Sequence, residues 1–365
     1  MSQLSATPLP FDPAFEHPEK DEAETTTHLI ETMQKISAVT TKDYGHAVRS
    51  VHAKSHGLLY GTMTVLDDLP PELAQGIFAK AATFKLVMRL STTPGDILDD
   101  NVSTPRGMAV KVIGVEGARL PGSENDATQD FLMVNGPAFL KPDAKSFSNS
   151  IKLLAATTDK AEGLKKAFSA VLRGAEKALE SVGAQSPTLI SLGGHAETNI
   201  LGETFYSQAP LLYGQYFCKL SIAPVSAELT ALTKAPVDLH NKPNGLREAV
   251  VSHFSAHGGE WEMRVQLCTN LDTMPVEDAS VVWPESESPY IAVARIRVDA
   301  QPAWNTERES VIDGGLSFSV WHGCAAHRPL GSVNRVRKAV YEAMAAARLR
   351  TNTQPVGEPK TLESP

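Results

Sequence analysis

Residues 334–348 read NRVRKAVYEAMAAAR and place Arg337, Tyr341 and Arg348 in the spacing R-x3-Y-x6-R. An α-helix turns by about 100° per residue, so offsets of four and seven positions return to nearly the same face. The alanines around these residues favour a helix. The stretch therefore predicts a helix over residues 332–350, one face of which presents a phenol between two guanidinium groups.

Such a face has the groups that a metal-bound phenolate needs. A neighbouring Arg⁺ favours the anionic form of a tyrosine, and coordination to ferric iron favours it far more. A second arginine is placed to bind a carboxylate. Tyrosinate on a haem iron, with arginines on the haem propionates, uses all three side chains. Because most Arg/Tyr faces of helices are solvated or paired with glutamates, this hypothesis requires a matching site elsewhere in the chain.

The composition is that of a large globular protein. Of 365 residues, 42% are hydrophobic and 21% are charged, which suffices for one large core or two smaller ones. The net charge of −8 offers no basic surface for nucleic acid. The three cysteines are far apart and odd in number, which argues against a disulfide scaffold.

The chain carries no predicted signal sequence or membrane span. Its first 27 residues contain many acidic residues and prolines but no apolar run of the signal-peptide type. No stretch approaches the roughly 18 consecutive apolar residues that a membrane helix requires. We therefore expect a cytoplasmic protein.

Hydrophobic periodicity divides the chain into three parts. Residues 1–27 are predicted to form an extended N-terminal arm, and residues 28–350 a single domain. Residues 351–365 are predicted to be a disordered tail, because they are polar and rich in proline. A G-x-G-x-x-G segment after a strand and a P-loop are both missing from the sequence, so nucleotide binding has no support.

Within the domain, helices are predicted over residues 27–39, 142–182, 243–256 and 332–350. Strand-like runs bounded by Gly, Pro, Asp or Asn are LLYGTMTV (58–65), FKLVMRLST (84–92), GMAVKVIGV (107–115), DFLMVN (130–135), YGQYFCKLSIAPV (213–225), EWEMRVQLCTN (260–270) and YIAVARIRVDA (290–300). Strands that do not alternate with helices favour an antiparallel sheet or barrel decorated by helices over a parallel βαβ fold.

A second group of motifs surrounds the first strands. R49-S-V-H52 precedes the first strand, R89-L-S91-T ends the second, and R106-G-M-A-V-K forms the third. Together with R-x3-Y-x6-R, these segments resemble the catalase superfamily in both content and order. The resemblance covers residues 28–350 and implies an α+β protein with a trimmed catalase-like fold, an antiparallel β-barrel of about eight strands with flanking helices. It also implies haem b as the cofactor.

The resemblance assigns a role to each matching residue. His52 would be the distal acid/base, and Ser91 would orient its imidazole. Tyr341 would be the axial ligand of the haem iron, with Arg337 beside it. The residues implied to contact the propionates or the porphyrin ring are Arg49, Arg89, Arg348 and Phe139.

Two departures from the catalase pattern affect the expected chemistry. Catalases carry a distal Asn shortly before a Thr that precedes the next strand, and counting back from Thr128 leads to Asp126, with Asn125 one residue earlier. Either Asn125 supplies the amide or a carboxyl group replaces it. The chain is also short, with no flavodoxin-like domain after Arg348, so we expect a more open route to the haem. The segments LGETFYSQAP and FSVWHGCAAHRPLG resemble a small catalase-related branch associated with organic peroxides.

The residue types suit peroxide cleavage. A neutral imidazole can take the proton from the iron-bound oxygen of a peroxide and return it to the departing oxygen. Arg49 lies three residues before His52, and on a flat strand the two side chains would point to opposite faces. If both reach the haem from one side, the backbone must turn between them.

We expect a haem-dependent peroxidase that reduces organic hydroperoxides, and hydrogen peroxide less well, through a ferryl intermediate. It would use a small reducing co-substrate, assemble as a homo-oligomer and protect against oxidative stress. A monofunctional catalase is the first alternative. Rearrangement of a fatty-acid hydroperoxide is less favoured, because enzymes of that kind carry Thr before the distal His and this chain has Val51. A haem sensor or store without turnover would not need His52.

Overall fold

The structure is a computed structural model and describes residues 6–102, 104–155, 196–355 and 357–361. The helix predicted over residues 142–182 therefore lies partly outside the described residues, including its clearest amphipathic stretch, LKKAFSAVLRGAEKALESV.

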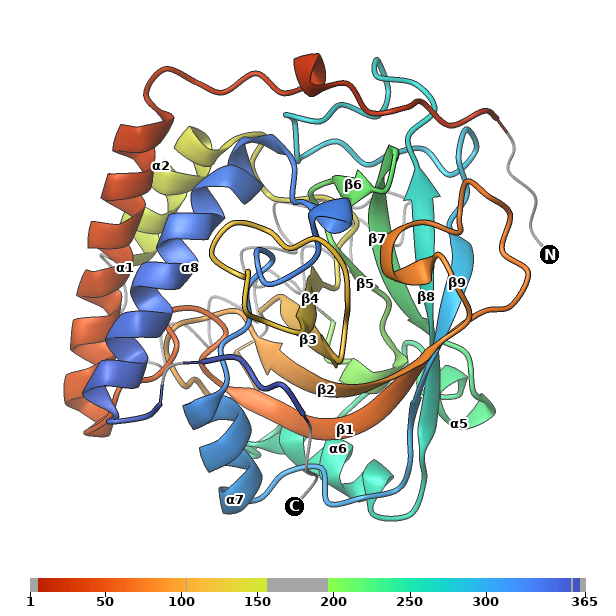
Figure 1. The fold of residues 1–365 in the computed structure, drawn as a ribbon. Helices are drawn as coiled ribbons and strands as arrows, with labels where there is room; N and C mark the ends of the chain where they lie inside the picture. The colour runs from red at the N-terminus through yellow and green to blue at the C-terminus, as the bar shows by residue number, and fades with distance from the viewer. Residues whose placement is uncertain (1–5, 103, 156–195, 356, 362–365) are drawn as a thin grey trace, which may run out of the picture.

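The described residues contain a nine-stranded antiparallel sheet that closes into a barrel (Figure 1). The strands run in the order β5-β4-β3-β2-β1-β9-β8-β7-β6, and β5 also pairs with β7. This second pairing closes eight strands into a barrel, while β6 extends β7 as a hairpin. The strands are β1 (Ser55–Val65), β2 (Thr83–Thr92), β3 (Arg106–Ile113), β4 (Thr128–Val134), β5 (Phe205–Tyr206), β6 (Leu211–Tyr213), β7 (Tyr216–Pro224), β8 (Gly259–Leu267) and β9 (Ile291–Val298).

Alternation along the strands separates the barrel core from the outer surface of the barrel. In β3, Met108, Val110 and Val112 belong to the main core cluster inside the barrel. Successive side chains of a strand point to opposite faces, so Gly107 and Ala109 face outward. The motif R-G-M-A-V-K thus places its small residues on the surface that the helices cover.

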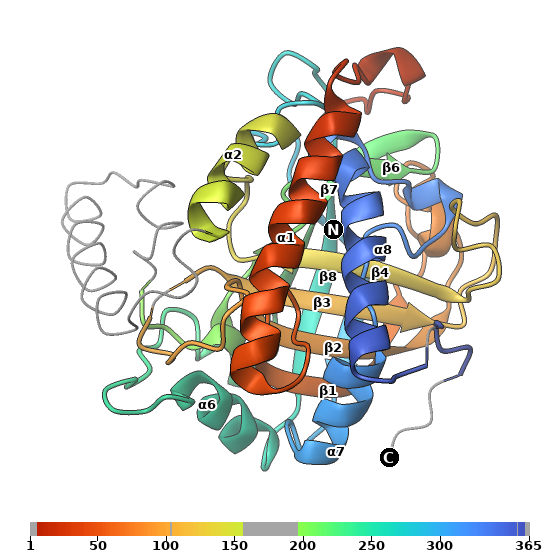
Figure 2. The ribbon, with the colours of Figure 1, turned by 90° about the vertical axis from the view of Figure 1, so that its left-hand side faces the viewer.

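Three long helices lie side by side in front of this outer surface (Figure 2). They are α1 (Glu22–Tyr44), α2 (Ala144–Ala155) and α8 (Gly331–Thr351). Leu29 and Met33 of α1, Ile151 of α2 and Val336 and Val340 of α8 form a second core cluster between them. Shorter helices, α5 (Ala227–Thr230), α6 (Gly245–Phe254) and α7 (Thr306–Arg308), lie elsewhere around the barrel.

The observed elements agree closely with the predicted ones. The helices predicted over residues 27–39, 243–256 and 332–350 correspond to α1, α6 and α8. Each predicted run also contains a strand, although YGQYFCKLSIAPV splits at Gly214 (φ 63°) into the hairpin of β6 and β7. The strand β5 was not predicted, because two residues are too few to show a period.

The N-terminal arm packs on the barrel and crosses it at the top of Figure 1. The rings of Phe11 and Phe15 lie 5.9 Å and 5.8 Å from the ring of Phe217, and the amide of Leu9 donates to the carbonyl of Cys268. Among the described residues, no helix has the length and apolar character to cross a membrane.

Candidate functional site

His52 lies on a sharp turn just before β1, with φ 53°. This left-handed conformation is uncommon for residues other than glycine. Two backbone hydrogen bonds hold it, from His52 N to the carbonyl of Thr93 (2.7 Å) and from Ala53 N to the carbonyl of Pro94 (3.0 Å). The backbone therefore turns between Arg49 and His52, as the sequence predicts for side chains that share one side.

The imidazole of His52 is held between Ser91 and Gly107. Its Nδ1 lies 3.0 Å from the hydroxyl of Ser91. A Cβ atom added at Gly107 would lie only 2.5 Å from Cε1 of the ring. Ser91 and Gly107 are paired residues of β2 and β3, so both contribute to the same patch of the outer surface of the barrel. A glycine is needed at position 107 because any side chain there would displace the imidazole.

The environment keeps His52 uncharged. Burial, together with the positive charges of Arg89, Arg337 and Arg49, lowers the pKa of His52 to about 3. Arg89 also donates through Nη2 to the carbonyl of His52 at 2.8 Å, so it braces the loop that carries the ring. At neutral pH the ring has one protonated nitrogen and one nitrogen that can accept a proton.

Tyr341 and Arg337 are paired on α8, as their spacing predicts. Arg337 Nη2 donates to the phenol oxygen of Tyr341 at 2.7 Å, and the guanidinium lies 4.9 Å from the centre of the ring. Arg337 Nη1 donates to Oδ1 of Asn334 at 3.1 Å, and Nδ2 of Asn334 donates to the carbonyl of Pro210. The guanidinium is thus fixed against the phenol oxygen.

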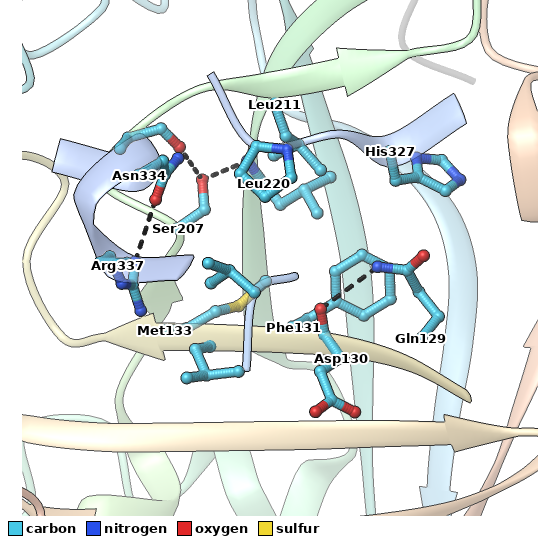
Figure 3. Close-up of a pocket in the computed structure, with 14 residues that line it drawn as sticks. Gln129, Asp130, Phe131, Met133, Ser207, Leu211, Leu220, His327, Asn334 and Arg337 are labelled. Carbon is cyan, nitrogen blue, oxygen red and sulfur yellow. Dashed lines mark hydrogen bonds between the residues drawn. The ribbon is translucent and has the colours of Figure 1, made fainter. Parts of the chain in front are cut away.

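Figure 3 shows a cavity between the first turns of α8 and the barrel. Asn334 and Arg337 of α8 line it, together with Met133, Leu220 and His327. Its volume is about 30 Å³, enough for roughly one water molecule. The cavity is therefore too small for a substrate. It lies between Arg337 and the barrel.

The histidine loop and the tyrosine helix meet at one apolar cluster. Val51, next to His52, packs there with Phe147 of α2 and with Met344, one turn after Tyr341. Sequence reasoning did not identify Phe147, although its place in the first turns of an amphipathic helix was a signal. The loop before β1 and α8 are thus neighbours although nearly 300 residues separate them in the sequence.

Phe139 packs against the ring of Phe147. The two rings are 5.0 Å apart at an angle of 58°. Phe139 also packs against Ala209, Ala279 and Val333. Of the two aromatic residues, Phe147 is the one that shares a cluster with Val51.

Arg49, Arg89 and Arg348 converge on residues 309–316, which we call the strap. Arg89 Nε donates to the carboxylate of Asp313. Arg348 donates to backbone carbonyls of the strap over 2.6–2.8 Å, and Arg49 does so over 3.0–3.3 Å. Three arginines that are distant in the sequence therefore form one cluster.

The arginine cluster has an excess of positive charge. Burial lowers the pKa of Arg348 to about 10 and that of Arg49 well below its usual value. Burial also acts to raise the pKa of Asp313, but Arg89 and Arg49 outweigh it and the pKa is lowered. Three cations and one anion leave two positive charges, and Nε of Arg49 is buried without a hydrogen-bond partner.

These features fit a haem. A phenol oxygen held by an arginine suits the iron, and the neutral imidazole of His52 follows Val51, which packs against the same apolar cluster as Met344 of α8. Two uncompensated positive charges suit two propionates. The residues that would hold the group are Tyr341, Arg49, Arg89 and Arg348.

The structure places Asn125 and Asp126 before the start of β4, and their place beside His52 stays a prediction. Strand β4 runs antiparallel to β3, and Gly107 pairs with Val134 at the end of β4. Thr128, at the start of β4, pairs with Ile113, six residues or about 20 Å along β3. The side chain of Asp126 accepts a hydrogen bond from Ser123 (3.1 Å).

At the C-terminal end of β4, Val134 pairs with Gly107 and lies on the same face of the sheet. The side-chain amide of the next residue, Asn135, is hydrogen-bonded to groups other than His52. Its oxygen accepts from the backbone of Arg106 at 2.9 Å, and its nitrogen donates to Glu203. The wall beside His52 thus carries the methyl groups of a valine at this position.

A group of possible metal ligands lies on the outer surface of the barrel. Ligand atoms of Asp130, His322 and Glu358 lie within 4.8 Å of one another, the only such group among the described residues. Lys111 Nζ donates to both carboxylates, so an ammonium group already provides the positive charge. Glu358 also accepts a hydrogen bond from the hydroxyl of Thr128 (3.0 Å).

Comparisons with known proteins were made at three levels. No family model matches the chain, and no curated protein matches its sequence. Similar solved structures include a fungal catalase (TM-score 0.59, 17% identity, 86% of this chain and 61% of that one) and catalase A from Saccharomyces cerevisiae (0.58, 18%, 86% and 63%). A bacterial catalase has a TM-score of 0.56 at 14% identity, over 95% of this chain and 64% of that one.

The chain thus spans less than two thirds of the length of these catalases. Identities of 14–18% establish the fold alone. They agree with the arrangement seen here, in which eight antiparallel strands close into a barrel with helices along its outer surface. This chain therefore has the catalase fold.

Proposed function

We propose that this protein is a haem-dependent peroxidase that reduces organic hydroperoxides, and hydrogen peroxide less well. The observation that carries the proposal is a set of two hydrogen-bonded pairs, His52 with Ser91 and Tyr341 with Arg337. The residues beside them, Val51 and Met344, pack against the same apolar cluster. The catalase fold supports an oxidoreductase that acts on peroxide.

The cofactor proposed for this site is haem b. When bound, it would supply an iron that binds the peroxide and takes up the oxidising equivalents released by O–O cleavage. Tyr341 would ligate this iron as the phenolate, which the charge and hydrogen bond of Arg337 stabilise. Arg49, Arg89 and Arg348 would bind the propionates.

His52 would move the proton. Its neutral ring takes the proton from the attacking oxygen of the peroxide and returns it to the departing oxygen, a role worth roughly 10²–10⁴-fold in rate. Ser91 Oγ, 3.0 Å from Nδ1, holds the ring in one orientation, and Gly107 leaves the space for it. Phe139 and Phe147 would pack against the edge or face of the porphyrin.

The apolar wall supports organic hydroperoxides as the preferred class. Val134 lies beside Gly107, and Val51 and Phe147 lie on the adjacent cluster. An alkyl group has little favourable hydration to lose when it contacts such a wall, and the burial of its apolar surface is favourable. The second hydroxyl of hydrogen peroxide would lose hydrogen bonds to water there. A small reducing co-substrate would return the enzyme to its resting state, and assembly as a homo-oligomer remains a prediction.

A monofunctional catalase is the second candidate, because the solved structures with this fold are catalases. The two functions are separated by kinetics on the haem-loaded protein. We expect kcat/KM for dye oxidation with cumene hydroperoxide to exceed kcat/KM for oxygen release from hydrogen peroxide. The reverse order would favour the catalase, and no turnover with either peroxide would favour a sensor or store.

A further inference from the structure

The strap is an unusual piece of backbone. Its first part, η5 (Glu309–Gly315), is a π-helical turn, a conformation that is rare and frequent at functional sites. It ends in Gly314 and Gly315, two residues that restrict backbone rotation least. The strap therefore combines a weak helical geometry with a flexible end.

Each of the three arginines of the cluster forms hydrogen bonds with the strap. Asp313 forms the ion pair with Arg89, and backbone carbonyls of the strap accept from Arg348 and Arg49. Among the described residues, Asp313 is the only carboxylate that forms an ion pair with these arginines. It thus occupies the position of an anionic ligand.

Asp313 compensates the cluster incompletely. Its Oδ1 lies 3.8 Å from Nε of Arg49, which is too far for a hydrogen bond. That Nε atom is buried without a partner. A ligand with two carboxylates could satisfy donors that one aspartate leaves unpaired.

The strap also has space to withdraw from the arginines. On its outer side, a cleft of about 470 Å³ separates it from residues 354–355 and 357–359. Ser310, Val311, Gly315 and Leu316 line this cleft, and Val311 is 46% exposed. Movement toward the cleft would also draw the buried side chain of Ile312 away from Leu58 and Val87 of the barrel.

We propose that Asp313 competes with the carboxylates of the haem for Arg49, Arg89 and Arg348, so that the strap regulates loading of the cofactor. The inference rests on the proposed haem site. Loading requires Asp313 to release Arg89 and the strap to move toward the outer cleft. The strap therefore occupies the arginines in place of the carboxylates of the haem. The affinity for the cofactor depends on how strongly the strap is bound to these arginines.

The test uses Asp313→Asn, which keeps the shape of the side chain and removes its charge. The matched control is Glu309→Gln, because Glu309 lies in the same turn but forms no ion pair with the three arginines. The probe is metal-free protoporphyrin IX, followed by fluorescence, with its dimethyl ester as the uncharged analogue. Since the probe has no iron, binding depends neither on Tyr341 ligation nor on turnover.

We expect Asp313→Asn to bind the diacid at least about tenfold more tightly than the wild type. The reason is that the wild type must break one charged hydrogen bond, between Asp313 and Arg89, before the diacid can bind. The ester should show no such gain, and Glu309→Gln should match the wild type with both probes. Equal or weaker binding of the diacid by Asp313→Asn would overturn the competition while leaving the haem site intact. If no protein binds either porphyrin, the proposed haem site fails together with it.

A second measurement covers the case in which Asp313→Asn does not fold. Hydrogen–deuterium exchange of the wild-type peptide that contains residues 309–316 should increase when the diacid binds, because the strap leaves the arginines. The ester should cause a smaller increase. Unchanged or decreased exchange with the diacid would show that the strap stays in place, and the inference would be abandoned.

Discussion

At the scale of single residues, the position of the His52 imidazole depends on the absence of a side chain at Gly107. The imidazole of His52 occupies the space that a Cβ atom at position 107 would take. The same ring is held by Ser91 and by a left-handed backbone turn. Catalytic geometry here is thus determined by steric room as much as by hydrogen bonds.

Gly107→Ala tests this directly. The added methyl group would lie 2.5 Å from the ring of His52 and would push the imidazole away from Ser91. We expect peroxidase activity to fall by about 10²-fold, the lower range for a misplaced general base, while haem binding is retained. Gly136→Ala is the matched control, because its Cβ would meet only an ordinary contact at 3.6 Å. Full activity in Gly107→Ala would show that the ring position is unimportant.

The pH–rate profile tests the charge state of His52. Because burial and three arginines lower its pKa to about 3, the ring should stay neutral from pH 8 down to about pH 5. The rate of reaction with cumene hydroperoxide should therefore not decline through pH 6.5, the usual pKa of histidine. Stopped-flow measurement that shows a single ionisation near pH 6.5 would contradict the neutral buried ring.

At the scale of elements, α8 could be predicted well because its information is local. The periodicity of residues 332–350 identified the helix, and the Arg337–Tyr341 spacing led to the hydrogen bond that is observed. The end of β4 that lies near His52 could not be predicted, since antiparallel pairing is a tertiary property. For the same reason, the strap and its Asp313 were missed.

Tyr341→Phe tests the role of α8 as the proximal helix. The variant removes the phenol oxygen that Arg337 holds at 2.7 Å and therefore the proposed anionic ligand of the iron. Haem should bind weakly, and the absorption spectrum of a tyrosinate-ligated ferric haem should disappear. Tyr216→Phe, on the barrel strand β7, is the control and should keep the spectrum. A wild-type spectrum in Tyr341→Phe would exclude Tyr341 as the ligand.

At the scale of the whole molecule, the fold assembles the site from distant segments. The loop that carries Arg49 and His52, the outer surface of the barrel, the strap and α8 contribute to it. The barrel supplies a surface to which the strap is attached through the three arginines and through the buried side chain of Ile312. Assembly therefore buries several titratable groups, and this has a consequence for stability.

Among the described histidines, His56 and His327 are buried and His52 is partly buried, and each is held in the uncharged form. Burial lowers the pKa of His327 to about 4 and that of His56 well below its usual value, in addition to the effect on His52. In the unfolded chain each has a pKa of about 6.5, so below this pH the unfolded state binds protons that the folded state does not. The free energy of unfolding should therefore fall as the pH decreases from about 6.5 to 4.

His327→Gln isolates one part of this effect. His327 Nε2 accepts from the amide of Ile77 at 3.0 Å, and a glutamine oxygen can accept the same bond without titrating. Each buried histidine contributes up to about 1.4 kcal/mol per pH unit below pH 6, so the variant should lose roughly 1 kcal/mol per pH unit of the slope between pH 6 and 5. Urea unfolding of the wild type, His327→Gln and the exposed control His240→Gln at pH 7.5, 6.0, 5.5 and 5.0 measures this difference. A slope in His327→Gln equal to that of the wild type would mean that His327 is protonated in the folded protein.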